Sequence, residues 1–240
     1  MGKAKKSALR LLPPDWRESI WATASTPEWQ QSRPQLLPAL AVLWITGCRP
    51  AEIEQGIELV AGRHQLVVKI TGAKCVDAGG RERGQPTRHI GFNIDANANP
   101  ALRFLHALAE QSAANGLGTY TITHNKDYLY NSVVALGRSA FPTLRTRISP
   151  YCFRHQVASD LKAATSDREI TLEQAAKVMG HLSDYSIGAY GHAVHGRRGR
   201  SGRVLVPFVR TARPIKHSPK VDRLARFKMA SAKRREHKAD

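Results

Sequence analysis

A chain of 240 residues, 42% of them hydrophobic, is long enough for one substantial domain with a proper core, which excludes a wholly disordered protein. No apolar run has the length of a membrane span, and the N-terminus lacks the apolar stretch of a secretion signal, so we expect no membrane segment and no export. The three cysteines are scattered and show no CxxC spacing, which favours a reducing cytoplasm over a disulfide or zinc framework.

Charge is concentrated at the C-terminal end of the chain. The last fifty residues, 191–240, hold 15 Lys/Arg and 3 Asp/Glu, a balance of +12, whereas residues 1–190 hold 22 and 16, a balance of +6. Such an excess attracts a polyanion, most often nucleic acid, and a solubilising basic tail is the alternative. We divide the chain into a lead-in (1–33), a main domain (34–193) and a basic tail (194–240).

Helical and strand patterns alternate along the main domain. The lead-in holds one helix, and residues 35–46 form a buried helix that ends at Gly47. Pro50 then begins a short helix. Three strands follow at 57–60, 64–71 and 87–94, and further helices at 99–115, 126–139, 150–164 and 171–179. The predicted fold is therefore mainly α with a small three-stranded antiparallel sheet.

Two cations lie at element ends in the first half of the domain. Arg49 lies between Gly47 and Pro50, and an arginine is a poor helix N-cap. A phosphate bound at the new helix would explain it, and so would an ion pair with Glu52 or Glu54. Lys74 follows the second strand, where a lysine is usually only a solvated charge.

Two more sets of polar residues lie in the second half of the domain, one at the start of a helix and one at a break between helices. The helix that begins at Ser149–Pro150 places Tyr151, Arg154 and His155 on one face, which fits either a polar exposed first turn or a site.

Further on, in GHLSDYSIGAY, Gly180 ends one helix and Ser183 is a candidate N-cap for another. This break allows His181 and Tyr190 to point into one cleft, although a tyrosine there is more often a packing residue.

These residues together resemble the tyrosine recombinases, the phage integrase and Xer-like enzymes. TGCRPAEI is similar to the family's TGxRxxE box, YCFRH to its HxLRH box, and MGHLSDYSIGAY to its LGHxSxxTTxxY box, while Lys74 falls at the hairpin lysine. The resemblance covers residues 35–193. It implies the recombinase catalytic-domain fold and a catalytic set of Arg49, Lys74, Tyr151, Arg154, His181 and Tyr190.

The resemblance also implies a mechanism. Tyr190 attacks a DNA phosphodiester and leaves a 3′-phosphotyrosyl bond. Arg49 and Arg154 neutralise the phosphate, Lys74 protonates the leaving 5′-oxygen, and His181 donates a hydrogen bond. Neither ATP nor a metal cofactor is required.

The implied partner is double-stranded DNA, bound by a homotetramer in a bacterial or phage-type cytoplasm at the nucleoid. The predicted DNA-contacting residues are Arg88, His155, Arg197, Arg198, Arg200 and Arg203.

Two departures from the family pattern keep alternatives open. Tyr151 stands where the family has His or Lys, and only 48 residues precede Arg49, so we expect a short form without the usual N-terminal DNA-clamping domain. The alternatives are a weak or inactive DNA-binding relative, a type IB topoisomerase-like enzyme that relaxes supercoils without a specific site, and a basic RNA- or ribosome-binding protein.

Overall fold

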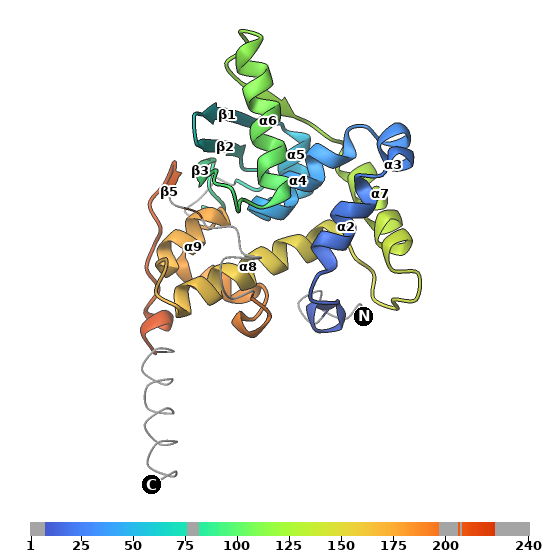
Figure 1. Ribbon diagram of the computed structural model, residues 1–240. Coiled ribbons are helices and arrows are strands. Elements are labelled where there is room, and N and C mark those ends of the chain that lie inside the picture. The colour runs from blue at the N-terminus through green and yellow to red at the C-terminus, as the bar shows by residue number, and fades with distance from the viewer. Residues whose placement is uncertain (1–7, 76–81, 197–205, 207, 224–240) are drawn as a thin grey trace.

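The computed structural model describes residues 8–75, 82–196, 206 and 208–223 (Figure 1). Helices predominate, as predicted. They are α2 (Trp16–Ala24), α3 (Pro27–Ser32), α4 (Leu36–Thr46), α5 (Pro50–Glu54), α6 (Pro100–Ala114), α7 (Lys126–Ala140), α8 (Pro150–Ser166) and α9 (Leu172–Val178). Short 3-10 helices are η1 (Leu9–Leu11), η2 (Asp184–Ala189) and η3 (Ala193–His195).

The sheet has five antiparallel strands, where the sequence predicts three. The predicted strands are present as β1 (Ile57–Gly62), β2 (Gln65–Thr71) and β3 (Thr87–Asn93). An extra strand lies at each edge, β4 (Tyr120–Ile122) beside β1 and β5 (Phe208–Thr211) beside β3, in the order β4-β1-β2-β3-β5. The prediction was wrong here because β4 is too short for a visible alternation.

The strand β5 was missed because it comes from the segment predicted as a basic tail. Its pairing places Phe208 opposite Gly91. A side chain on Gly91 would occupy the position of the Phe208 ring, so the glycine is what allows the ring to lie across β3. This part of the tail therefore belongs to the sheet. Residues 224–240 of the predicted basic tail lie outside the described residues.

The core lies between the sheet and the helices. Alternate residues of β2, Leu66, Val68 and Ile70, are fully buried, and α6 packs against β1 and β2 (Figure 1). α4 is buried along almost its whole length, as its run of apolar residues predicts, and it packs against α6 and α8. None of the helices in the described part of the chain is long and apolar enough to cross a membrane.

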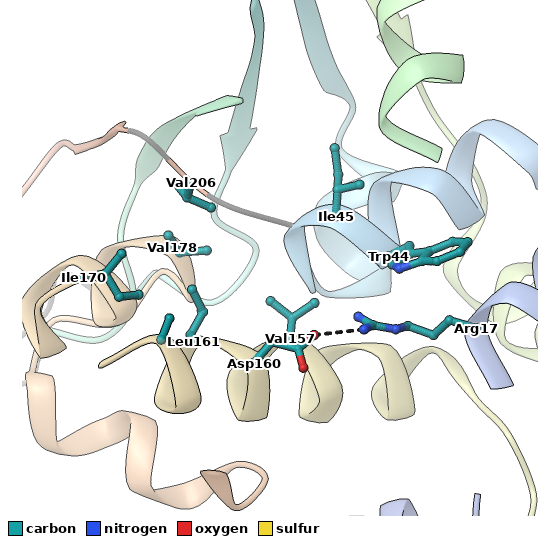
Figure 2. A pocket seen from close by; sticks show the side chains of 10 residues that line it. Arg17, Trp44, Ile45, Val157, Asp160, Leu161, Ile170, Val178 and Val206 are labelled. Carbon is teal, nitrogen blue, oxygen red and sulfur yellow. Dashed lines mark ion pairs between the residues drawn. The ribbon is translucent and has the colours of Figure 1, made fainter. Parts of the chain in front are cut away.

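The lead-in holds two helices and a 3-10 turn, where the sequence predicts one helix, and it packs into the same core. Trp16 is 2% exposed and meets Phe153 of α8 edge to face, with ring centroids 4.6 Å apart. Next to it, Arg17 and Asp160 form a buried ion pair of 2.9 Å (Figure 2). The cavity beside this pair is about 20 Å³, which is room for about one water molecule and too small for a ligand.

Candidate functional site

The corner between α4 and α5 positions the first predicted arginine. Gly47 ends α4 in the left-handed conformation (φ 60°), and a Cβ there would lie 2.9 Å from Val157 of α8. The carbonyl oxygen of Gly47 accepts a hydrogen bond of 2.8 Å from Nη1 of Arg154. This close approach fixes the corner that carries Arg49 against the helix that carries Arg154.

Arg49 forms an ion pair with Glu52, which is one of the two explanations that the sequence analysis gives for its position. Glu52 accepts bonds of 2.8 Å from both the backbone N–H and Nη1 of Arg49, and the Arg49 side chain also hydrogen-bonds Tyr190. Burial lowers the pKa of Arg49, but Glu52 and Tyr190 together raise it above the usual value. The ion pair therefore orients Arg49 towards the tyrosine and leaves it fully charged.

Glu52 also binds a second arginine, Arg88, which the sequence analysis predicts as a DNA contact. Both terminal nitrogens of Arg88, at the start of β3, bond the Glu52 carboxylate at 3.2 and 2.9 Å, and Arg88 is only 1% exposed. Arg88 therefore supports the site from inside through Glu52, and the DNA contact predicted for it stays a prediction. Burial acts to raise the pKa of Glu52, but Arg88 and Arg49 outweigh it and bring that pKa to about 2.

Arg154 lies inside the protein, so an exposed first turn of α8 does not describe it. Its Nη2 donates to the carbonyl oxygen of Met179 at 2.8 Å and lies 3.4 Å from both the Tyr190 hydroxyl and Nε2 of His181. The guanidinium carbon is 4.7 Å from the centre of the Tyr190 ring. Burial and the charge of Arg49 lower the pKa of Arg154. The usual pKa of an arginine is so high that the guanidinium stays charged at pH 7.

His181 follows the helix end at Gly180, which has φ 67°, as the sequence predicts. Its ring stacks on Tyr190 with centroids 5.2 Å apart. Burial, followed by the charges of Arg154 and Arg49, lowers the pKa of His181 to about 3, so the imidazole is neutral at pH 7. The buried amide of Gln85 donates to the His181 carbonyl oxygen at 3.1 Å and also bonds Arg213 beyond β5.

Tyr190 immediately follows η2, whose N-cap is Ser183, as predicted. The Ser183 hydroxyl accepts a hydrogen bond from the backbone N–H of Tyr185. Burial acts to raise the pKa of the Tyr190 phenol, but Arg154 and Arg49 lower it below the usual value by their charge and their hydrogen bonds. This is the help that a weakly acidic tyrosine needs to serve as a nucleophile. Three segments distant in sequence, at residues 49, 154 and 181–190, therefore meet at one phenol.

The other predicted residues have different positions. His155 lies beside Tyr190, with ring centroids 5.5 Å apart, and Tyr151 is half-buried in the first turn of α8. Lys74 is exposed in the turn after β2 and forms no ion pair with any described residue. Arg197, Arg198, Arg200 and Arg203 lie outside the described residues.

Metal-ligating side chains do not cluster in the described part of the site. Among the residues that the structure describes, no group of three or more His, Cys, Asp and Glu side chains could hold an ion. Its chemistry is instead cationic: Arg49, Arg88 and Arg154 surround a single carboxylate, Glu52. Such a site suits an oxyanion, because the positive guanidinium groups that contact the Tyr190 oxygen can also bind negatively charged oxygens beside it.

Comparison with family models and with curated proteins gives no match. Among solved structures, the chain is similar to the XerH site-specific recombinase bound to its difH substrate in a pre-cleavage complex, with a TM-score of 0.45 and 18% sequence identity. The alignment covers 78% of this chain and 49% of that chain, so this chain spans about half the length of the recombinase.

Proposed function

We propose that this protein breaks and rejoins DNA strands through a covalent tyrosine intermediate, as a site-specific recombinase. The observation that carries the proposal is the meeting of Arg49, Arg154 and His181 at the hydroxyl and ring of Tyr190. In the proposed step the phenol oxygen forms a bond to phosphorus and the bond to the 5′-oxygen breaks. The phenol loses its proton, and the departing 5′-oxygen gains one. Attack on the same phosphorus by the 5′-hydroxyl of a partner strand then forms a new phosphodiester and releases the phenol, which exchanges the strands, whereas attack by the original hydroxyl only reseals the cut.

The arginines have the main role in this step. Negative charge collects on the non-bridging oxygens of the phosphate, and a fixed charged donor at such a position contributes about 10²–10³ in rate. Arg49 and Arg154 keep their charge, and both already hydrogen-bond the attacking oxygen. His181, neutral at pH 7, supplies one N–H donor. Because the phosphotyrosyl bond conserves the energy of the broken ester, the proposed reaction needs no ATP, and because Arg49 and Arg154 neutralise the phosphate it needs no metal.

Lys74 is the proposed general acid for the 5′-oxygen. Its place in the exposed turn between β2 and β3 leaves the ammonium accessible to a DNA strand laid over the site. Tyr151 and His155 lie on the first turns of α8, next to Arg154, where a neutral hydrogen bond to phosphate is available. The tetramer on DNA and the backbone contacts by Arg197, Arg198, Arg200 and Arg203 remain part of the proposal.

The test is a covalent trap. Purified protein is mixed in EDTA with nicked duplexes tiled across the DNA that flanks its own gene, and the products are run on a denaturing gel. A protein–DNA band is expected with the wild type and with Tyr185→Phe, which alters an exposed tyrosine five residues away. The band should vanish with Tyr190→Phe. A band that survives Tyr190→Phe would refute the assigned nucleophile.

One observation favours a second candidate, a DNA-binding relative with little or no activity. Tyr151, half-buried in the first turn of α8, stands where the resembled family has His or Lys, and a phenol is neutral at pH 7. Tight DNA binding by the wild type without any covalent band, on every duplex tested, would favour this candidate. Relaxation of supercoiled plasmid without site preference would instead indicate a topoisomerase.

A further inference from the structure

We propose that Lys162 is a positioning residue that holds Tyr190 in the active site of its own chain, against the helix that carries Arg154. The inference deepens the proposed function and rests on it. Lys162 belongs to none of the recombinase-like boxes, and it lies on α8, eight residues after Arg154, about 12 Å along the helix axis.

Lys162 binds two consecutive carbonyl groups of the backbone, beginning at the nucleophile itself. Its ammonium donates to the carbonyl oxygen of Tyr190 at 3.1 Å and to that of Gly191 at 2.6 Å. The side chain is half-buried, so these charge-assisted bonds are less weakened by water than those of an exposed lysine. They fix the backbone at the base of the tyrosine, while Arg154 and Arg49 bind its far end.

Two glycines allow the chain to approach α8 this closely. A Cβ on Gly191 would collide with the Ser159 side chain and with the carbonyl oxygen of His155, both on α8. One on Gly196 would collide with the Ser159 backbone and with Ala163. The segment that follows Tyr190, including η3, therefore lies directly on the same helix that supplies Arg154.

This contact has a function because the local structure around Tyr190 is weak. η2 is a 3-10 helix of six residues, and short helices of this kind have poor hydrogen-bond geometry. The phenol oxygen lies 3.4 Å from Arg154, at the outer limit of a hydrogen bond, so a small shift of the backbone would separate the two groups. A misplacement of about 1 Å at a reacting group costs about 10²-fold in rate.

The experiment uses two readouts on the full chain. The first is the pKa of the Tyr190 phenol, taken from the ultraviolet titration of each protein minus that of its Tyr190→Phe counterpart, because the chain has six tyrosines. The second is the initial rate of covalent attachment to a nicked duplex. The variants are Lys162→Met, Lys162→Arg and Gly191→Ala, with Lys177→Met as control, since Lys177 forms a surface ion pair with Glu173 on α9.

Lys162→Met and Gly191→Ala should both raise the phenol pKa towards its usual value and slow attachment by about 10²-fold, because both move the phenol away from the arginines. Lys162→Arg, which can still donate to both carbonyls, should restore most of both readouts, and Lys177→Met should change neither. Should Lys162→Met fail to fold, Lys162→Gln gives the same test with a smaller loss of side chain.

Two outcomes would overturn the positioning role. The first is an unchanged phenol titration in both Lys162→Met and Gly191→Ala. The second is a shift of the phenol pKa in Lys162→Met but not in Gly191→Ala. Gly191→Ala keeps the positive charge of the lysine, so such a result would mean that the charge itself, and not the position of the phenol, sets the pKa. The titration needs no DNA, so it tests Lys162 even if the wild type forms no covalent band, an outcome that would count against the proposed function instead.

Discussion

Glu52 is the carboxylate on which the arrangement of the site depends, and Glu52→Gln is the sharpest way to test that dependence. The change keeps the size of the side chain but removes the charge that two arginines share. Arg49 is partly exposed and can turn to water, whereas Arg88 is 1% exposed and has no such escape. The variant would therefore leave a buried guanidinium without its counter-charge.

The magnitude follows from the contacts in two ways. Removing one partner of a buried ion pair typically costs about 3–5 kcal/mol. The fall of the Glu52 pKa from 4.5 to about 2 corresponds to about 3 kcal/mol of stabilisation of the charged form. Because the folded pKa is the lower one, this contribution is present above pH 4.5 and is lost as the pH falls towards about 2. We expect Glu52→Gln to lower the free energy of unfolding at pH 7 by about 3 kcal/mol.

Urea unfolding at pH 7 measures this loss, and the chain offers a matched control. Glu54, two residues on, pairs with Lys126 at the surface, so Glu54→Gln should leave the midpoint almost unchanged. The double variant Glu52→Gln/Arg88→Met should lose less than the sum of its single changes, since it removes both buried charges together. Equal midpoints for Glu52→Gln and Glu54→Gln would refute the reasoning.

Two further expectations concern acid and salt. Because the folded pKa of His181 is about 3 against an ordinary 6.5, only the unfolded chain takes up this proton between those values, and stability falls as the pH drops below 6.5. Thermal unfolding should show wild type losing about 2 kcal/mol more than His181→Gln between pH 7 and pH 5, and equal losses would contradict the assignment. Replacing Arg197, Arg198, Arg200 and Arg203 by Gln should make the slope of log affinity against log salt shallower by about 4 if each contacts a DNA phosphate, and an unchanged slope would remove them from the proposed surface.

The parts of the site that the sequence predicts are those with local causes. Gly47 and Gly180 both adopt the left-handed conformation, which a helix end favours in glycine, and the chain turns where each lies. Pro50 and Ser183 begin the next elements by equally local rules. These four positions sufficed to predict the turns beside which Arg49 and His181 lie.

The supports of the site had no local signal. Glu52 and Arg88 are 36 residues apart, and Gln85 bonds Arg213 across 128 residues. An arginine on a strand gives no indication of whether it faces solvent or a buried carboxylate, which is why Arg88 was predicted on the DNA side. Lys162 looked like an ordinary polar residue of α8. Only the fold brings it beneath the carbonyl oxygens of Tyr190 and Gly191.

The charges at the site explain why its parts have separable effects. Three guanidinium groups, one carboxylate and a neutral imidazole sum to +2 (3 − 1), and a phosphodiester together with a phenolate would bring that sum to zero. Without DNA, the excess acts on Tyr190 alone and lowers the pKa of its phenol. In the proposed complex, a bound phosphate would take up part of the same charge and raise that pKa again. We therefore expect loss of Arg49 or Arg154 to weaken both phosphate binding and phenol ionisation. Lys162 binds the carbonyl oxygens of Tyr190 and Gly191, so under the proposed positioning role we expect its loss to change where the phenol lies.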